Sequence, residues 1–311
     1  MHGGFGKMFH TLPIAVRAYA ESHGFAHDIG KVAQRIEAVT VTVPRQQSVY
    51  RFVAHHGDYA QRLAHELSNT DYLHQRGIAT PRLQHRETIT GYDVLRFGYI
   101  AGDVVGIKAA DFHAECLGTQ LRQIHDRCTD NLPSTCNTID ILFFSRPLFA
   151  PNNAHEFTAA QRASAAAEIA RFQIHTAQID GHTLVHTDCH FNNMVFHDDT
   201  VTLIDWAECG RGSRFIDIGV VVHDITYHQE RTRDNLRAFL RGYFGRTEIT
   251  NHELVLIDAY VRHRFLEAMI WHLDDTPEMQ AAEYTENRDW IATCLHHAQT
   301  FTLATWCDVS V

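Results

Sequence analysis

The alternation of apolar and polar positions predicts strands in the first third of the chain. Residues 38–43 (AVTVTV) and 48–54 (SVYRFVA) are rich in β-branched residues, and the connecting PRQQS has turn chemistry. Residues 78–102 predict further strands, with turns at Pro81 and Gly91. A small β-sheet is therefore expected in this region.

Helical periodicity accompanies these strands and dominates after Asp111. Apolar residues recur at helical spacing in 58–77, which ends at Gly77, and residues 11–24 predict a short helix. The same periodicity predicts longer helices at 111–128, 156–178, about 229–244, 251–274 and 278–305.

Short apolar strands interrupt the helical part, at 182–186 (HTLVH), 193–198 (NMVFHD) and 200–206 (TVTLIDW). The whole pattern predicts an α+β fold. We place the boundary near Gly102, which gives a β-rich N-lobe (residues 1–101) and a mostly helical C-lobe (residues 102–311).

Composition narrows the classes of function. Of the 311 residues, 45% are hydrophobic, which is ample for a large core, and no apolar run approaches the roughly 20 residues that cross a bilayer. The formal net charge of −10 disfavours nucleic acid as a partner. The seven cysteines are odd in number and form no C-x-x-C pair, which indicates neither a disulfide framework nor a thiolate zinc site. We see no secretory signal and expect a cytoplasmic protein without a membrane partner.

The most informative segment is residues 184–219. His186-x-Asp188-x4-Asn193 directly follows an apolar strand, and Asp205 ends a second one, twelve residues beyond Asn193. Phosphoryl transfer requires a carboxylate near the attacking hydroxyl and oxygen ligands that hold Mg²⁺ on the phosphates. Asp188 would orient the acceptor hydroxyl and take its proton, while Asn193 and Asp205 would hold the metal.

This segment resembles the catalytic core of the aminoglycoside phosphotransferase and choline kinase family, small-molecule kinases that share the protein kinase fold. Protein kinases carry H-R-D and D-F-G, whereas this family carries H-x-D and I-D-W, matched here by residues 186–188 and 204–206. The resemblance implies a bilobal protein-kinase-like fold, with ATP or GTP as the phosphate donor and Mg²⁺ as cofactor. It also implies that His186 orients the catalytic loop, that Asp217 braces it, and that His125 serves packing.

The resemblance extends to the N-lobe. Arg51 takes the place of the lysine that grips the α- and β-phosphates, and Glu66 on the following helix would be its ion-pair partner; a solvated strand residue is the alternative for Arg51. The loop between the first two strands, near residues 33–39, carries no glycine, unlike in protein kinases. The segment expected to contact adenine through its backbone consists of Arg96, Phe97, Gly98, Tyr99 and Ile100.

In this family the helical lobe supplies the acceptor pocket. Residues 273–290 are rich in carboxylates and lie beside two tryptophans. Carboxylates and aromatic faces attract an ammonium group, which favours an amine-bearing acceptor; a solvated helix face is the alternative. The candidate acceptor residues are Trp271, Asp274, Asp275 and Glu278.

The sequence therefore predicts a phosphotransferase that moves the γ-phosphate of ATP to a hydroxyl of a small molecule, such as an aminoglycoside-like antibiotic. One alternative is a metabolic kinase for choline, a methylthio-sugar or an amino-acid alcohol. Another is a catalytically silent nucleotide-binding module, although silent kinase folds usually lose the base or a metal ligand. A third is a zinc hydrolase that uses His186 and His190, which lack the Glu of H-E-x-x-H.

Overall fold

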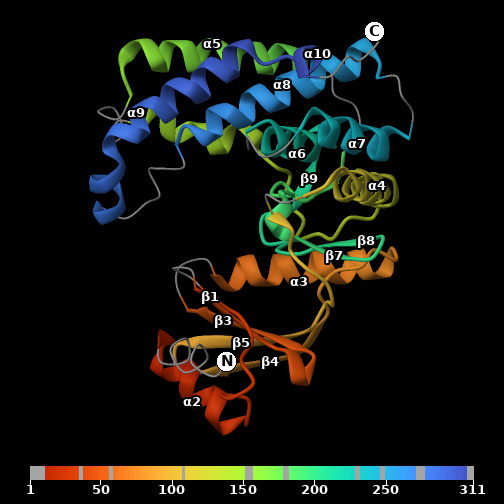
Figure 1. The fold of residues 1–311 in the computed structure, drawn as a ribbon, viewed down its shortest axis with the longest axis vertical. Helices are drawn as coiled ribbons and strands as arrows, with labels where there is room; N and C mark the ends of the chain where they lie inside the picture. Colours follow the sequence, from red (N-terminus) through yellow and green to blue (C-terminus); the bar gives the residue numbers. More distant parts are fainter. Residues whose placement is uncertain are drawn as a thin grey trace. The chain divides into compact units, whose positions relative to one another are not determined.

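A computed structural model describes residues 11–34, 38–55, 59–106, 109–150, 157–177, 182–227, 232–245, 249–270 and 277–306 (Figure 1). The chain forms two compact units. Unit 1 comprises Met1–Asp103, Val195–Asp198 and Thr202–Ala207, and unit 2 comprises Val104–Met194, Asp199–Val201 and Glu208–Val311.

Unit 1 contains a five-stranded antiparallel sheet in the order β1-β2-β3-β5-β4. Its strands are β1 (Val32–Gln34), β2 (Ala38–Val43), β3 (Ser48–Ala54), β4 (Leu83–Ile89) and β5 (Tyr92–Gly98). The strands predicted from alternation are confirmed. One expectation is corrected: Ala33 and Gln34, which we placed in a loop, belong to β1, and residues 35–37 of that loop lie outside the described residues.

Two helices cover opposite faces of this sheet, α2 (Ile14–Ser22) and α3 (Tyr59–Gln75), as Figure 1 shows. One core cluster joins Val16 and Tyr19 of α2 to Phe52 of β3, while a second joins Leu63 of α3 to Leu95 of β5. Because successive strand residues point to opposite faces, two apolar layers are needed to cover the sheet.

Unit 2 is mainly helical. Its helices are α4 (Asp111–Arg127), α5 (Ala159–Thr176), α6 (Phe215–Tyr227), α7 (Arg233–Phe244), α8 (Asn251–Ala268), α9 (Pro277–Thr300) and α10 (Leu303–Trp306), with 3-10 segments η3 (Ile141–Phe149) and η5 (Phe191–Asn193). Strands β6 (Thr183–Val185) and β9 (Gly210–Gly212) of unit 2 pair antiparallel. Strand β7 (Met194–His197) pairs with β8 (Thr200–Leu203), and these two strands are divided between the units, since Val195–Asp198 and Thr202–Ala207 belong to unit 1. The α+β fold class is confirmed.

The periodicity did not predict α6. Eleven of its thirteen residues are buried, so it lacks the polar face that makes a surface helix recognisable. The predicted helix 251–274 is also shorter than expected, since α8 ends at Ala268.

Glycines allow α4 and α7 to approach each other closely. A Cβ atom on Gly118 would lie 2.2 Å from the Phe239 carbonyl oxygen, and one on Gly242 would lie 2.1 Å from the Glu115 carbonyl oxygen. Only residues without a side chain fit at this crossing.

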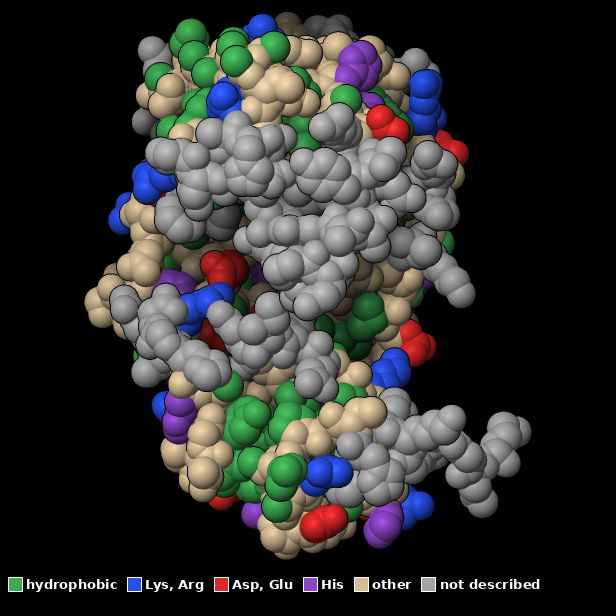
Figure 2. Space-filling model, turned by 90° about the vertical axis from the view of Figure 1, so that its left-hand side faces the viewer, with side chains coloured by type: hydrophobic (Ala, Val, Ile, Leu, Met, Phe, Trp, Pro, Cys, Tyr) green, Lys and Arg blue, Asp and Glu red, His purple; other side chains and the backbone are tan. Residues whose placement is uncertain are grey.

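No helix in the described part of the chain is sufficiently long and apolar to span a membrane. On the face shown in Figure 2, basic and acidic side chains of the described residues are interspersed and do not form separate patches.

Candidate active site

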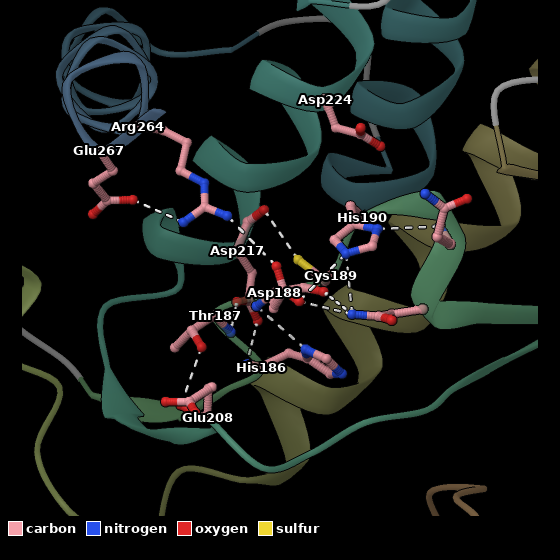
Figure 3. A network of polar contacts seen from close by, with 12 residues as sticks. His186, Thr187, Asp188, Cys189, His190, Glu208, Asp217, Asp224, Arg264 and Glu267 are labelled. Carbon is pink, nitrogen blue, oxygen red and sulfur yellow. Dashed lines mark hydrogen bonds and ion pairs between the residues drawn. The ribbon is translucent and has the colours of Figure 1, made fainter. Parts of the chain in front are cut away.

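The loop between β6 and η5 carries His186, Thr187 and Asp188 and has a strained backbone. Thr187 has a φ of +68°, a left-handed conformation that is costly for a β-branched residue. The Thr187 N–H donates to Asp217 Oδ1 (2.8 Å), the His186 N–H donates to Asp217 Oδ2 (2.9 Å), and Thr187 Oγ1 donates to the Glu208 carbonyl (3.0 Å). Asp217, on α6, therefore fixes the turn that presents Asp188 (Figure 3).

Asp217 is itself anchored from two other helices. His125 of α4 places Nε2 3.0 Å from Asp217 Oδ2, and its Nδ1 lies 2.7 Å from the hydroxyl of Tyr243 on α7. Burial opposes ionisation of Asp217, but the hydrogen bond and charge of His125 and the charge of His186 hold its pKa below the usual value. The packing role that we assigned to His125 is thus incomplete, because His125 is a polar support of the loop.

The structure brings Asp188 and Asn193 together. Asn193 Nδ2 donates to Asp188 Oδ2 (2.8 Å) and to the Asp188 carbonyl (2.9 Å). His190 adds Nε2 at 3.3 Å from the same Oδ2. Burial raises the pKa of Asp188, but the His190 hydrogen bond and charge, followed by the charges of Arg264 and His186, hold it well below the usual value. Asp188 is therefore a carboxylate at neutral pH, able to accept a hydrogen bond from a hydroxyl group.

His186 is fully buried, and its Nδ1 accepts a hydrogen bond from the Asp188 N–H (3.3 Å). This contact agrees with an orienting role for the imidazole. His190 Nδ1 likewise accepts from the Asn192 N–H at 3.2 Å, so both imidazoles make hydrogen bonds within the loop.

A residue that the sequence did not single out also reaches Asp188. Arg264, on α8, places NH2 3.5 Å from Asp188 Oδ1 and donates through NH1 to Glu267 Oε2 (2.8 Å). Both residues lie on a helix whose sequence has no motif that distinguishes them. Only the packing of α8 near the loop identifies Arg264.

Unit 1 carries the other half of the predicted site. Arg51 NH1, on β3, donates to Glu66 Oε1 (2.8 Å) and Oε2 (2.9 Å) on α3, so the ion pair predicted from the sequence is present. Asp205 also belongs to unit 1 and has a φ of +65°. Burial raises the pKa of Glu66, Asp205 raises it further, and Arg51 opposes the rise.

The predicted adenine-contacting segment begins in β5. The Gly98 N–H donates to the Arg82 carbonyl (3.0 Å) and the Tyr99 N–H to the Gln47 carbonyl (2.9 Å). Tyr99 is exposed, whereas Phe97 is buried in the core. Because these two N–H groups already have acceptors, a nucleotide would have to use other backbone groups of residues 96–100.

Comparison with known proteins identifies the family. Residues 35–253 match the phosphotransferase enzyme family. This chain belongs to that family. No curated protein sequence matches this chain.

Solved structures support the fold of this phosphotransferase. An amicoumacin kinase in complex with AMP-PNP, Ca²⁺ and Ami has a TM-score of 0.70 at 15% identity, with 96% of each chain covered. A microcompartment-associated aminopropanol kinase has a TM-score of 0.66 at 16% identity, covering 94% of this chain and 98% of the other. A choline/ethanolamine kinase family protein from Mesorhizobium loti has a TM-score of 0.65 at 16% identity, with 87% of each chain covered. These structures confirm the predicted protein-kinase-like fold, and the family match confirms that the chain is a phosphotransferase.

The donor atoms of this phosphotransferase suit a divalent cation. The Asn193 side chain makes its hydrogen bonds through Nδ2, which leaves Oδ1 without a protein partner among the described residues. The described residues contain no group of three or more His, Cys, Asp or Glu side chains able to hold a metal. Magnesium typically takes only one or two protein carboxylates and completes its shell with phosphate oxygens and water.

The acceptor residues of the phosphotransferase remain predictions. Trp271, Asp274 and Asp275 lie outside the described residues, and Glu278 falls in α9 at a position whose side chain is also outside them.

Proposed function

We propose that this phosphotransferase transfers the γ-phosphate of ATP to a hydroxyl group of a small, amine-bearing molecule. The observation that carries the proposal is the braced loop, in which Asp217 holds the strained turn at Thr187 and Asn193 and His190 hold the Asp188 carboxylate. A loop built in this way presents an ionised carboxylate to the solvent, since the Asp188 side chain is 37% exposed. Asp188 is the catalytic base of the proposal.

The roles of the residues follow from their chemistry. Asp188 accepts a hydrogen bond from the acceptor hydroxyl, orients it and takes its proton as the phosphoryl group transfers. Arg51, held by Glu66, binds the α- and β-phosphates through its planar fork, and residues 96–100 contact the adenine. Asn193 and Asp205 would hold Mg²⁺, and the ion would neutralise charge on the phosphates.

The net charge of the protein and the names of two structural neighbours support an acceptor that carries an amine. The protein has a formal net charge of −10, which favours a cationic ligand over an anionic one. Two structural neighbours are named as an aminopropanol kinase and a choline/ethanolamine kinase family protein, and these names refer to alcohols that carry a cationic nitrogen. Amino alcohols and antibiotics with amino groups are therefore the acceptors to try first, and a metabolic amino-alcohol kinase is the second candidate.

Radiolabelled γ-phosphate with a panel of paired acceptors tests this function. Each pair consists of an amine-bearing alcohol and its amine-free analogue, incubated with Mg·ATP and, separately, with Mg·GTP. We expect label transfer to at least one amine-bearing alcohol, a preference over its analogue, and no transfer by Asp188→Ala. Transfer that survives in Asp188→Ala would contradict the assignment of the base, and equal transfer to both members of every pair would contradict the amine preference.

A further inference from the structure

The two oxygens of the Asp188 carboxylate are held by different parts of unit 2. Oδ2 is held within the loop, by Asn193 Nδ2 at 2.8 Å and His190 Nε2 at 3.3 Å. The contact to Oδ1 among the described residues comes from Arg264, 76 positions further along the chain. The orientation of Oδ1 therefore depends on α8.

Arg264 is held next to the Asp188 carboxylate by a contact within α8. Its side chain is 17% exposed, and its NH1 donates to Glu267 Oε2 (2.8 Å), one turn further along the helix. Glu267 is 3% exposed and has His263 Nδ1 3.1 Å from its other oxygen. Figure 3 shows the guanidinium between Glu267 and the loop. Burial opposes the charge of Glu267, but the Arg264 charge and the His263 contact keep its pKa below the usual value.

The distances distinguish the two contacts of the guanidinium. At 2.8 Å the contact with Glu267 is a strong charge-assisted hydrogen bond, whereas 3.5 Å to Asp188 Oδ1 is at the limit for a hydrogen bond. Arg264 is thus bound mainly to Glu267, and its second amino group attracts Oδ1 without saturating it. A carboxylate oxygen has two lone-pair sites, so Oδ1 keeps the capacity to accept a hydrogen bond from an acceptor hydroxyl.

We propose that Arg264 is a positioning residue for phosphoryl transfer, anchored by Glu267, that aims Oδ1 of Asp188 at the acceptor hydroxyl. This inference rests on the proposed function, in which Asp188 is the base. Near-attack geometry is sensitive to displacements of about 1 Å, which can reduce turnover roughly 100-fold. Among the described residues, Arg264 makes the contact to the Asp188 side chain that comes from outside the loop, so losing it should lower the rate of the chemical step and leave nucleotide binding unchanged.

A paired substitution tests the proposal without leaving a buried charge alone. Replacing a buried ion pair with apolar residues of similar volume is often neutral for stability, so Arg264→Met combined with Glu267→Met should fold. The matched control is the pair Glu168 and Arg171 on α5, which has the same spacing, a distance of 3.1 Å and a buried glutamate, replaced by methionine in the same way. Arg264→Lys keeps the charge but replaces the planar fork with a shorter, single ammonium group.

We expect the Arg264/Glu267 double variant to lose roughly 10- to 100-fold in kcat, with the KM for nucleotide within about twofold of wild type. Arg264→Lys should melt near the wild-type temperature and recover part of the lost kcat, and the control pair should keep the wild-type kcat. Wild-type kcat in the folded double variant overturns the proposal. If the double variant does not fold, wild-type kcat in Arg264→Lys overturns it.

A crystal structure of the double variant, or of Arg264→Lys, separates this inference from the proposed function because it requires no turnover. The proposal expects the Asp188 carboxylate to rotate so that Oδ1 leaves its wild-type direction, and an unchanged carboxylate overturns it. A wild-type protein that transfers phosphate to no acceptor would instead contradict the proposed function.

Discussion

Replacing Asp217 with alanine should both destabilise the protein and nearly abolish phosphoryl transfer. The fully buried carboxylate accepts hydrogen bonds from the His186 and Thr187 N–H groups and contacts His125 Nε2. The substitution leaves two buried donors and an imidazole without their partner. Each unsatisfied buried group costs about 1–3 kcal/mol, and removing one member of a buried charged pair costs about 3–5 kcal/mol. We expect a loss of about 4 kcal/mol in the free energy of unfolding, a large share of the roughly 5–15 kcal/mol typical of a domain.

Asp217→Ala should lower kcat by more than the fraction of unfolded protein explains. Without Asp217, the left-handed turn at Thr187 loses the bonds that offset its strain, and Asp188 shifts from its place. A displacement of about 1 Å can cost roughly 100-fold in kcat. Chemical denaturation gives the free energy of unfolding, and kcat is measured at a temperature at which the variant is still folded.

Asp224→Ala is the matched control on the same helix. Asp224 Oδ2 accepts a hydrogen bond from the Phe191 N–H (3.1 Å) at the start of η5, so its removal should cost about 0.5–1.5 kcal/mol. If Asp217→Ala lost no more stability than Asp224→Ala and kept wild-type kcat, the bracing role of Asp217 would be refuted.

Four further outcomes are expected. Gly118→Ala should lower the free energy of unfolding by about 1–3 kcal/mol or more in denaturant melts, because its Cβ would meet backbone atoms of α7. Gly98→Ala should cost less, since the nearest atom to its Cβ is the Gln84 side-chain nitrogen at 3.2 Å, and equal losses would contradict the packing argument. Thr187→Val loses the hydroxyl bond at about 1 kcal/mol and keeps the backbone strain, while Thr187→Gly relieves about 1–2 kcal/mol of strain, so the valine variant should be the less stable of the two. The pKa of Asp217 is lower in the folded state than in the unfolded state, so ionised Asp217 stabilises the fold above its unfolded pKa of about 3.9, and this stabilisation is lost as pH falls through its lower folded pKa. In acid titrations, Asp217→Asn should therefore flatten the fall in the free energy of unfolding below about pH 4. An unchanged slope would argue against this linkage. Arg51→Lys should raise the nucleotide KM, because lysine is shorter than arginine and replaces the planar fork, which can bind phosphate oxygens while NH1 stays on Glu66, with a single ammonium group. An unchanged KM would favour a surface role for Arg51.

The strands of unit 1 could be predicted because their sequence carries the physical cause of the structure. In β2, alternating residues are buried, so the period of two in the sequence directly reflects a half-buried strand. The same holds for α4, whose buried residues follow a helical stripe. The order of His186, Asp188, Asn193 and Asp205 was sufficient to identify the family, because phosphoryl transfer depends on a few oxygen-bearing groups in a short segment.

The resemblance predicted that Asp217 braces the loop, but only the tertiary structure showed what holds Asp217 and Asp188 in turn. No periodicity predicts α6, because a helix buried on all sides has no polar face. His125 lies 92 positions before its partner Asp217, and Arg264 lies 76 positions after its partner Asp188. Local sequence carries no information about contacts at such separations. The sequence by itself thus determined the family and the residues that we propose for the chemistry. The packing of α4, α6, α7 and α8 determined how their carboxylates are held, because buried polar groups must find partners wherever the fold brings them.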